Sequence, residues 1–300
     1  MFFRILINGL SLGSVYAIIA VGYALIFNIL KFSNFSHGSV MTVCAYLGYF
    51  FSLAMRNYFP TFPTGALIAL TAVFCVASGA VVGLVVERMA FWELRRKNTP
   101  MIYYFISSIT MSILLENIVN IFASTNFYSY PFSAVASHSV QIGEIYVGVM
   151  DILMITISVF LLVALMFVIF KTKVGIAMRA VSMDVSTAGL MGVDVNRIVL
   201  GTFVVAGMLA GISGMFLAMK YTLYPQLGRL VVKGFISSVI GGLGSITGAV
   251  TGAVLLGLTE IVLINLIGSG YAPVFSFLIM LVFLILRPRG IAGVIIQEKV

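Results

Sequence analysis

The sequence predicts an all-α membrane protein, a polytopic helical bundle of about eight spans with two discontinuous helices. Hydrophobic residues make up 61% of its 300 residues and charged residues only 9%, and its mean hydropathy is +1.17. No water-soluble globular domain of this length has such a composition. Apolar runs of about 20 residues recur, long enough to cross roughly 30 Å of hydrocarbon. Apolar and polar residues do not alternate along these runs as they do in barrel strands. The runs therefore form helices, in which backbone N–H and C=O groups are hydrogen-bonded internally.

The first half of the chain alternates apolar runs with short polar connections. We expect spans over residues 5–30, 39–55, 64–86 and 101–123. Residues 87–100 carry four basic side chains and the only Trp, so the positive-inside rule places this connection in the cytoplasm. Residues 124–145 contain no Lys or Arg, which suits an external loop. The first span is rich in Gly, Ala and Ser, which predicts a helix inside the bundle.

The longest interval that a bilayer core could not accept is 171–197, and the rest of the chain is arranged around it. Apolar runs flank it, and four basic residues against two acidic ones place it in the cytoplasm. Its apolar residues recur close to helical spacing, and Asp184 and its polar neighbours supply N-cap chemistry between two groups. We therefore expect two short surface helices joined by a bend. The alternative is an ordinary amphipathic loop lying on the membrane surface.

The last third of the chain gives conflicting signals about sidedness. Counting crossings places residues 220–233 outside, although they include Lys220, Arg229 and Lys233. Residues 234–268 are too long for one straight span and are broken at residues 241–245. We expect one re-entrant half-helix from Gly234 to about Gly242, then a packed helix and a last span over 271–286. This arrangement gives the odd number of crossings that an external loop and a cytoplasmic end require. The whole chain, 1–300, forms a single transmembrane domain in this interpretation.

Polar residues between apolar runs are the candidate functional groups. Asn34, Ser36 and His37 interrupt the first two spans, and polar groups at membrane depth are costly unless they face a cavity or partners. A discontinuous helix also exposes N–H and C=O groups that can meet a carboxylate or an ammonium. A polar interfacial loop is the alternative. Glu116 and Glu260 lie inside apolar runs, where they serve either hydrogen bonding between helices or a proton or ion relay.

Three elements carry recognisable residue patterns. Their residues are Asn34, Phe35, His37 and Gly38; Gly175, Ala177, Arg179, Ala180, Asp184, Ala188, Gly192 and Val193; and Gly241, Gly242, Leu243, Gly244, Ser245, Gly248 and Ala249. In this order they resemble permease subunits of branched-chain amino-acid (LIV-type) ABC importers. Ser36 stands where the family has Ala, and Ser186-Thr187 stands where the broader importer coupling motif has Glu-Ala.

The resemblance implies roles for two groups of residues. In that family the loop corresponding to 171–197 docks into a groove on an ATPase subunit and couples ATP hydrolysis to transport. The expected coupling residues are Gly175, Arg179, Ala180, Ala188 and Gly192. The expected substrate-pathway residues are Asn34, Ser36, His37, Gly38, Gly241, Gly242, Gly244 and Ser245.

The resemblance also implies partners: a second permease subunit in a heterodimer, two ATP-binding subunits and an external substrate-binding protein, in the bacterial cell (inner) membrane. The chain has no Gly-x-x-x-x-Gly-Lys-Ser/Thr stretch, so we expect ATP to be bound by the partners and no cofactor, metal or catalysis in this chain. Lys and Arg cluster at the ends of apolar runs, which excludes a nucleic-acid face. The alternative function is an ion- or proton-coupled carrier of a small polar solute.

Overall fold

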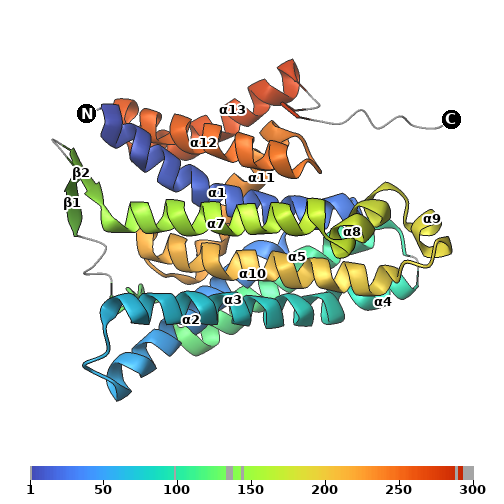
Figure 1. Cartoon of the computed structure of the whole chain (residues 1–300), viewed down its shortest axis with the longest axis horizontal. Coiled ribbons are helices and arrows are strands. Elements are labelled where there is room, and N and C mark those ends of the chain that lie inside the picture. Colours follow the sequence, from blue (N-terminus) through green and yellow to red (C-terminus); the bar gives the residue numbers. More distant parts are fainter. Residues whose placement is uncertain (1, 98, 133–137, 143–144, 288–289, 293–300) are drawn as a thin grey trace.

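The computed structural model describes residues 2–97, 99–132, 138–142, 145–287 and 290–292. Its long helices lie side by side along the longest axis of the molecule (Figure 1). Within the described residues, seven helices are long and apolar enough to cross a membrane. These helices are α1 (Phe2–Leu30), α2 (Ser36–Tyr58), α3 (Thr64–Val86), α5 (Met101–Ala123), α7 (Val149–Lys171), α10 (Val195–Tyr221) and α12 (Ile246–Ile267).

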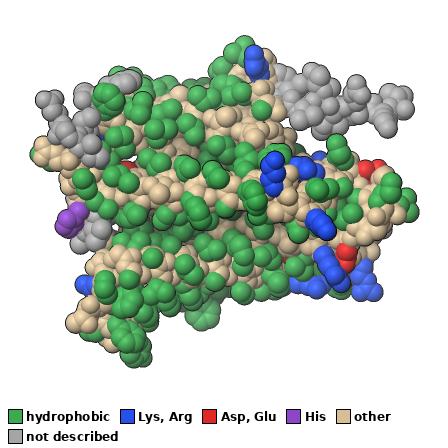
Figure 2. Space-filling model, viewed as in Figure 1, with side chains coloured by type: hydrophobic (Ala, Val, Ile, Leu, Met, Phe, Trp, Pro, Cys, Tyr) green, Lys and Arg blue, Asp and Glu red, His purple; other side chains and the backbone are tan. Residues whose placement is uncertain are grey.

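The two ends of the bundle differ in the way that the charge pattern predicts. One end carries α8 (Lys173–Met183), α9 (Val185–Leu190) and α4 (Trp92–Arg96), which continues α3 through a π-helical turn, η1 (Glu87–Phe91). The other carries an antiparallel pair, β1 (Ser139–Ile142) and β2 (Ile145–Gly148). Lys and Arg side chains gather at the first end, and hydrophobic side chains cover the flanks (Figure 2). The first end is therefore the cytoplasmic one.

Helix α1 lies at the centre of the bundle, as its small residues predict. It runs antiparallel to α12, and the two backbones approach closely because glycines face each other. A Cβ atom on Gly13 would lie 3.0 Å from the Cα atom of Val254, and one on Gly9 would lie 3.0 Å from the Cα atom of Leu258. Of the apolar window of α1, 89% is buried. This burial makes α1 the axis on which the other helices pack.

The predicted half-helix is α11 (Val231–Gly241), which begins at Val231 and not at Gly234 and follows a 3-10 turn, η2 (Pro225–Leu230). It is not re-entrant, because the chain comes from the external side and the turn after α11 lies near the cytoplasmic end of α1. Gly234 packs on Ile19, half-way along α1, and the turn after α11 approaches Asn28 near the cytoplasmic end of α1. The half-helix therefore crosses only the cytoplasmic half of the bundle. After α12 and a short turn, η3 (Ser269–Tyr271), the last apolar helix, α13 (Ala272–Leu286), has 15 residues and would extend about 22 Å.

The first discontinuity is shorter than expected. Helix α2 begins at Ser36 and not at residue 39, so the polar residues 36–38 belong to its first turn. Asn34 explains this early start, because its Oδ1 atom accepts hydrogen bonds from the Ser36 N–H at 3.1 Å and from the Ser36 hydroxyl at 2.6 Å. Lys31 adopts a left-handed conformation (φ 57°) and reverses the chain between α1 and α2.

Candidate functional site

The polar residues at the start of α2 lie inside the protein. Asn34, Ser36 and His37 are at most 3% exposed. The cavity beside Asn34 and His37 has a volume of only about 10 Å³, and its other walls come from α1, α3 and α10. Among the described residues, no hydrogen-bond partner reaches the His37 Nε2 atom. A cavity of this size holds about one water molecule and no solute.

Two glycines join the start of α2 to the segment that precedes the half-helix. Gly38 and Gly228 lie so close that a Cβ atom on either residue would overlap the carbonyl group of the other. Beside this contact, a Cβ atom on Gly22 would lie 2.8 Å from the His37 ring. The residues Asn34 to Gly38 therefore form a joint between α1, α2 and η2. They lie at the depth of the N-terminal end of α11.

The glycine-rich break between α11 and α12 lies at the other end of the half-helix. Gly242 (φ 109°) and Gly244 (φ 86°) adopt left-handed conformations that only glycine accommodates without strain. The Ser245 hydroxyl caps α12 by accepting a hydrogen bond from the Gly248 N–H at 3.1 Å. Gly241 packs directly on the backbone of Gly248. The two groups of predicted pathway residues are thus separated by α11, whose 11 residues span about 16 Å.

Each cation of the segment 220–233 is paired with an acid on another helix. Lys220 pairs with Asp151 on α7 at 3.0 Å, and Arg229 pairs with Glu116 on α5 at 3.2 Å. These pairs explain why the charge rule and the crossing parity disagree for this segment, because the three cations are neutralised within the bundle. The sequence singled out Glu116 and Glu260 as candidate functional acids, but it did not reveal which cations they contact.

The third pair is the most deeply buried. The ammonium of Lys233 on α11 pairs with the carboxylate of Glu260 on α12, whose side chain is 2% exposed. The Tyr16 hydroxyl of α1 donates a hydrogen bond to the same carboxylate at 3.1 Å. The Lys233 ammonium also lies 5.5 Å from the centre of the Tyr16 ring, within reach of a cation–π interaction. This cluster fixes the half-helix to the two central helices.

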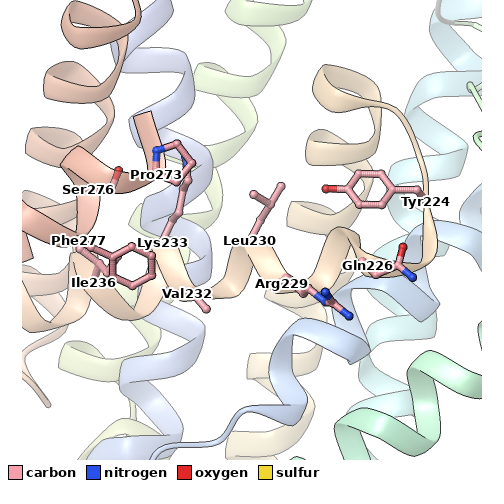
Figure 3. A pocket seen from close by; sticks show the side chains of 10 residues that line it. All are labelled: Tyr224, Gln226, Arg229, Leu230, Val232, Lys233, Ile236, Pro273, Ser276 and Phe277. Atoms are coloured by element: carbon pink, nitrogen blue, oxygen red, sulfur yellow. The ribbon is translucent and has the colours of Figure 1, made fainter. Parts of the chain in front are cut away.

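A pocket of about 390 Å³ opens between η2, the first turns of α11 and the start of α13. The polar side chains Tyr224, Gln226 and Arg229 lie at one end, while Ile236 and Phe277 lie at the other (Figure 3). The Arg229 side chain is 73% exposed. The complete lining is Tyr224, Gln226, Arg229, Leu230, Val232, Lys233, Ile236, Pro273, Ser276 and Phe277. No signal in the sequence alone brings α13 to this place.

The segment 171–197 folds into the two short helices that its pattern predicts. The Thr172 hydroxyl caps α8 by accepting a hydrogen bond from the Gly175 N–H at 3.2 Å. Asp184 forms the bend and caps α9, because one carboxylate oxygen accepts hydrogen bonds from the N–H groups of Ser186 (2.8 Å) and Thr187 (3.1 Å). The bonds to the Thr187 N–H and hydroxyl hold the pKa of Asp184 below its usual value.

Gly192 ends α9 in a Schellman motif. Its φ is +86°, its N–H donates to the Gly189 carbonyl at 3.0 Å, and the Val193 N–H donates to the Ala188 carbonyl at 3.1 Å. Asp194 then caps α10 by accepting a hydrogen bond from the Arg197 N–H at 3.1 Å. This arrangement fixes the direction in which α9 projects from the bundle.

The expected coupling residues occupy different environments in this segment. Gly175 packs on the backbone at the end of α7, and Ala188 is buried. The Arg179 guanidinium lies 5.4 Å from the centre of the Phe170 ring, and Ala180 beside it is half-buried. The exposed surface is formed instead by large apolar side chains that sequence reasoning noted only for their spacing: Met183 (89% exposed), Leu190 (89%) and Met191 (82%).

Comparisons with known proteins identify this architecture. The family described as branched-chain amino acid transport system / permease component matches residues 5–286. The chain belongs to this family. The high-affinity branched-chain amino acid transport system permease proteins BraD of Pseudomonas aeruginosa and LivH of Escherichia coli K12 are similar at 32% and 30% identity. The matches cover 98% and 100% of this chain, and 97% and 98% of the relatives.

More distant matches extend over the same length. A probable branched-chain amino acid transport permease protein LivH of Methanocaldococcus jannaschii is 27% identical over 97% of this chain and 92% of its own. A solved structure, PsaBC from Streptococcus pneumoniae in complex with Fab, covers 94% of this chain and 91% of its own with a TM-score of 0.47 at 14% identity. As a permease component with seven long apolar helices among its described residues, the chain is a multi-pass protein of the cell (inner) membrane.

Proposed function

We propose that this permease forms, with a second permease subunit, the translocation path of an ABC importer for branched-chain or related amino acids. The observation that carries this proposal is the family match over residues 5–286, together with full-length relatives named as permease proteins of branched-chain amino acid transport systems. An external binding protein delivers the solute, and two partner ATPase subunits bind and hydrolyse ATP. This chain supplies no cofactor and no catalytic group.

The segment 171–197 is the coupling element in this proposal. Its exposed apolar side chains Met183, Leu190 and Met191 belong to α8, α9 and the turn after α9, at the cytoplasmic end of the bundle. Large exposed apolar groups at such a place favour a protein interface. Gly175, Ala188 and Gly192 would act by setting the direction of α8 and α9, whereas Arg179 and Ala180 would lie at the edge of the contact.

The discontinuous segments give the path its movable parts. The joint at Asn34–Gly38 and the turn at Gly241–Ser245 bound the half-helix at its two ends, so a displacement of α8 and α9 would reach it through α1 and α10. Closure of the ATPase dimer would then change the side of the membrane to which the path opens. In this proposal the predicted pathway residues act by holding the half-helix, and not by contacting solute.

The test is reconstitution of the chain with its partner subunits in proteoliposomes. We expect uptake of leucine, isoleucine or valine that requires internal ATP and a loaded external binding protein, and co-purification of an ATP-binding subunit from mild detergent. Uptake driven by an ion gradient alone, with no ATPase in the complex, would overturn the proposal in favour of a coupled carrier that uses Glu116, His37 and Glu260.

A further inference from the structure

We propose that Arg229 is the residue that binds the carboxylate of the transported amino acid, in the 390 Å³ pocket between η2, α11 and α13. The proposal rests on the proposed function and adds to it a place in this chain where the solute is held. Three properties of the pocket support it: its depth, its charge and the arrangement of its other side chains.

The first property is depth. Gly228, next to Arg229, contacts Gly38, and Lys233 lies against Tyr16 half-way along α1, so the pocket lies within the span of the bundle and not at its outer end. Arg229 is nevertheless 73% exposed. An ionised side chain exposed at such a depth is expensive in contact with lipid, and such residues face a water-filled cavity or the interior of a bundle. This face therefore borders an aqueous path.

The second property is charge. The pocket lining contains two cations, Arg229 and Lys233, and no acid. Lys233 is committed to Glu260 and is only 13% exposed, so it is not available to a ligand. Arg229 contacts Glu116 through a single nitrogen, at 3.2 Å. The other donors of the planar guanidinium stay available for a carboxylate, which it binds in a bidentate fork.

The third property is the arrangement of the remaining lining. At the end that holds Arg229, the Tyr224 hydroxyl and the Gln226 amide oxygen can accept hydrogen bonds from an ammonium (Figure 3). At the other end, Ile236 and Phe277 offer an apolar wall to a hydrocarbon side chain, beside the polar groups of Lys233 and Ser276. The volume lies in the range of pockets that hold small ligands. The lining thus offers partners for the carboxylate, the ammonium and the hydrocarbon side chain of an aliphatic α-amino acid.

The experiment measures leucine molecules imported per ATP hydrolysed by the complete transporter in proteoliposomes. In Arg229→Gln we expect this ratio to fall about tenfold to hundredfold, because a charge-assisted hydrogen-bonded contact is lost. Arg229→Lys keeps the charge without the fork and should recover part of the loss. Because the readout is a ratio, it separates loss of solute handling from a lower yield of assembled complex.

A matched variant separates carboxylate binding from a structural ion pair. Glu116→Gln removes the same ion pair but leaves Arg229 free, so we expect its ratio to stay within about twofold of the wild type. Equal damage in Glu116→Gln and Arg229→Gln, or recovery in the double variant Arg229→Gln/Glu116→Gln, would overturn the proposal. Arg56→Gln, an exposed cation at the outer end of α2, serves as a control for loss of positive charge.

The same measurement keeps the two proposals apart. If the wild-type complex shows no ATP-dependent leucine uptake, the proposed function fails before any variant is compared. If the wild type transports leucine and Arg229→Gln transports it at the same ratio, the proposed function stands and the role of Arg229 is refuted.

Discussion

Lys233 on the half-helix α11 and Glu260 on α12 form an ion pair inside the bundle, with side chains that are 13% and 2% exposed. Tyr16 adds a hydrogen bond from α1 to the Glu260 carboxylate at 3.1 Å. A buried pair adds little stability compared with apolar residues, but the loss of one partner leaves a charge without compensation. The pair therefore specifies where the half-helix sits.

The first prediction concerns this pair. Lys233→Met should lower the free energy of unfolding by about 3–5 kcal/mol, because it leaves the Glu260 carboxylate buried and unpaired. The double variant Lys233→Met/Glu260→Met should recover most of that loss. Thermal denaturation of the purified protein in detergent measures both effects. A double variant as unstable as the single one would show that attraction between the two charges stabilises the fold, and would contradict the view that the pair mainly specifies the position of the half-helix.

The second prediction concerns the contact between Gly38 and Gly228. Gly38→Ala should destabilise the protein by about 1–3 kcal/mol or more, because the added methyl group overlaps the Gly228 carbonyl and the backbones must separate. Gly65→Ala is the matched control, since a Cβ atom at Gly65 meets no neighbour within 4 Å. Melting temperatures of the two variants, compared in the same detergent, provide the measurement. Equal melting temperatures would contradict the contact.

The third prediction concerns Gly192 in the Schellman motif. Gly192→Ala should cost about 1–2 kcal/mol, because a side chain disfavours the left-handed conformation that ends α9. Gly189→Ala, within the same helix, should be neutral or slightly stabilising, since alanine is the better helix former. Hydrogen exchange of the backbone amides of α9 measures both. Faster exchange in Gly189→Ala than in Gly192→Ala would refute this assignment.

The fourth prediction concerns pH and Asp184. Its folded-state pKa is lowered by the Thr187 N–H and hydroxyl, so the cap stabilises α9 above the ordinary Asp pKa of about 3.9 and is lost as the pH falls through the lower folded value. Protection of the α9 amides should therefore decrease in acid. Asp184→Asn keeps a capping side chain and should remove this pH dependence, whereas Asp184→Ala should lose protection at every pH.

The fifth prediction concerns the exposed apolar surface of α9. Leu190→Asp should leave the melting temperature unchanged, because the side chain is 89% exposed, yet weaken association with the ATPase subunit about tenfold or more. Tyr58→Asp, 81% exposed at the opposite end, should not affect that association. The measurement is the amount of ATPase subunit that co-purifies with each variant in detergent, at a series of ATPase concentrations. Equal retention of the ATPase by both variants would exclude Leu190 from the interface.

The sequence predicts the spans well where local signals are strong. Helices α3 and α5 begin after Pro63 and Pro100, and both end where their apolar runs end, so their bounds agree with the expected 64–86 and 101–123. The half-helix was predictable because glycines at 241 and 242 interrupt a run that is too long for one span. Local composition and turn chemistry are sufficient for these features.

Long-range pairing is what the sequence does not reveal. Arg229 and Glu116 are 113 residues apart, and Lys220 and Asp151 are 69 apart, so no local pattern links them. Composition also cannot distinguish a polar residue that faces a path from one packed inside the protein. The polar character of His37 was noticed from the sequence, whereas its burial in a contact with Gly22 became visible only in three dimensions.

The ion pairs of the segment 220–233 have a consequence for the order in which the chain enters the membrane. When Lys220 and Arg229 leave the ribosome, their partners Asp151 and Glu116 have already been synthesised. Lys233 differs, because Glu260 follows it by 27 residues. The Lys233 ammonium on the half-helix therefore has no acidic partner when it is synthesised. The half-helix can reach its final depth only after α12 has been synthesised. We therefore expect α11 and α12 to insert into the membrane together.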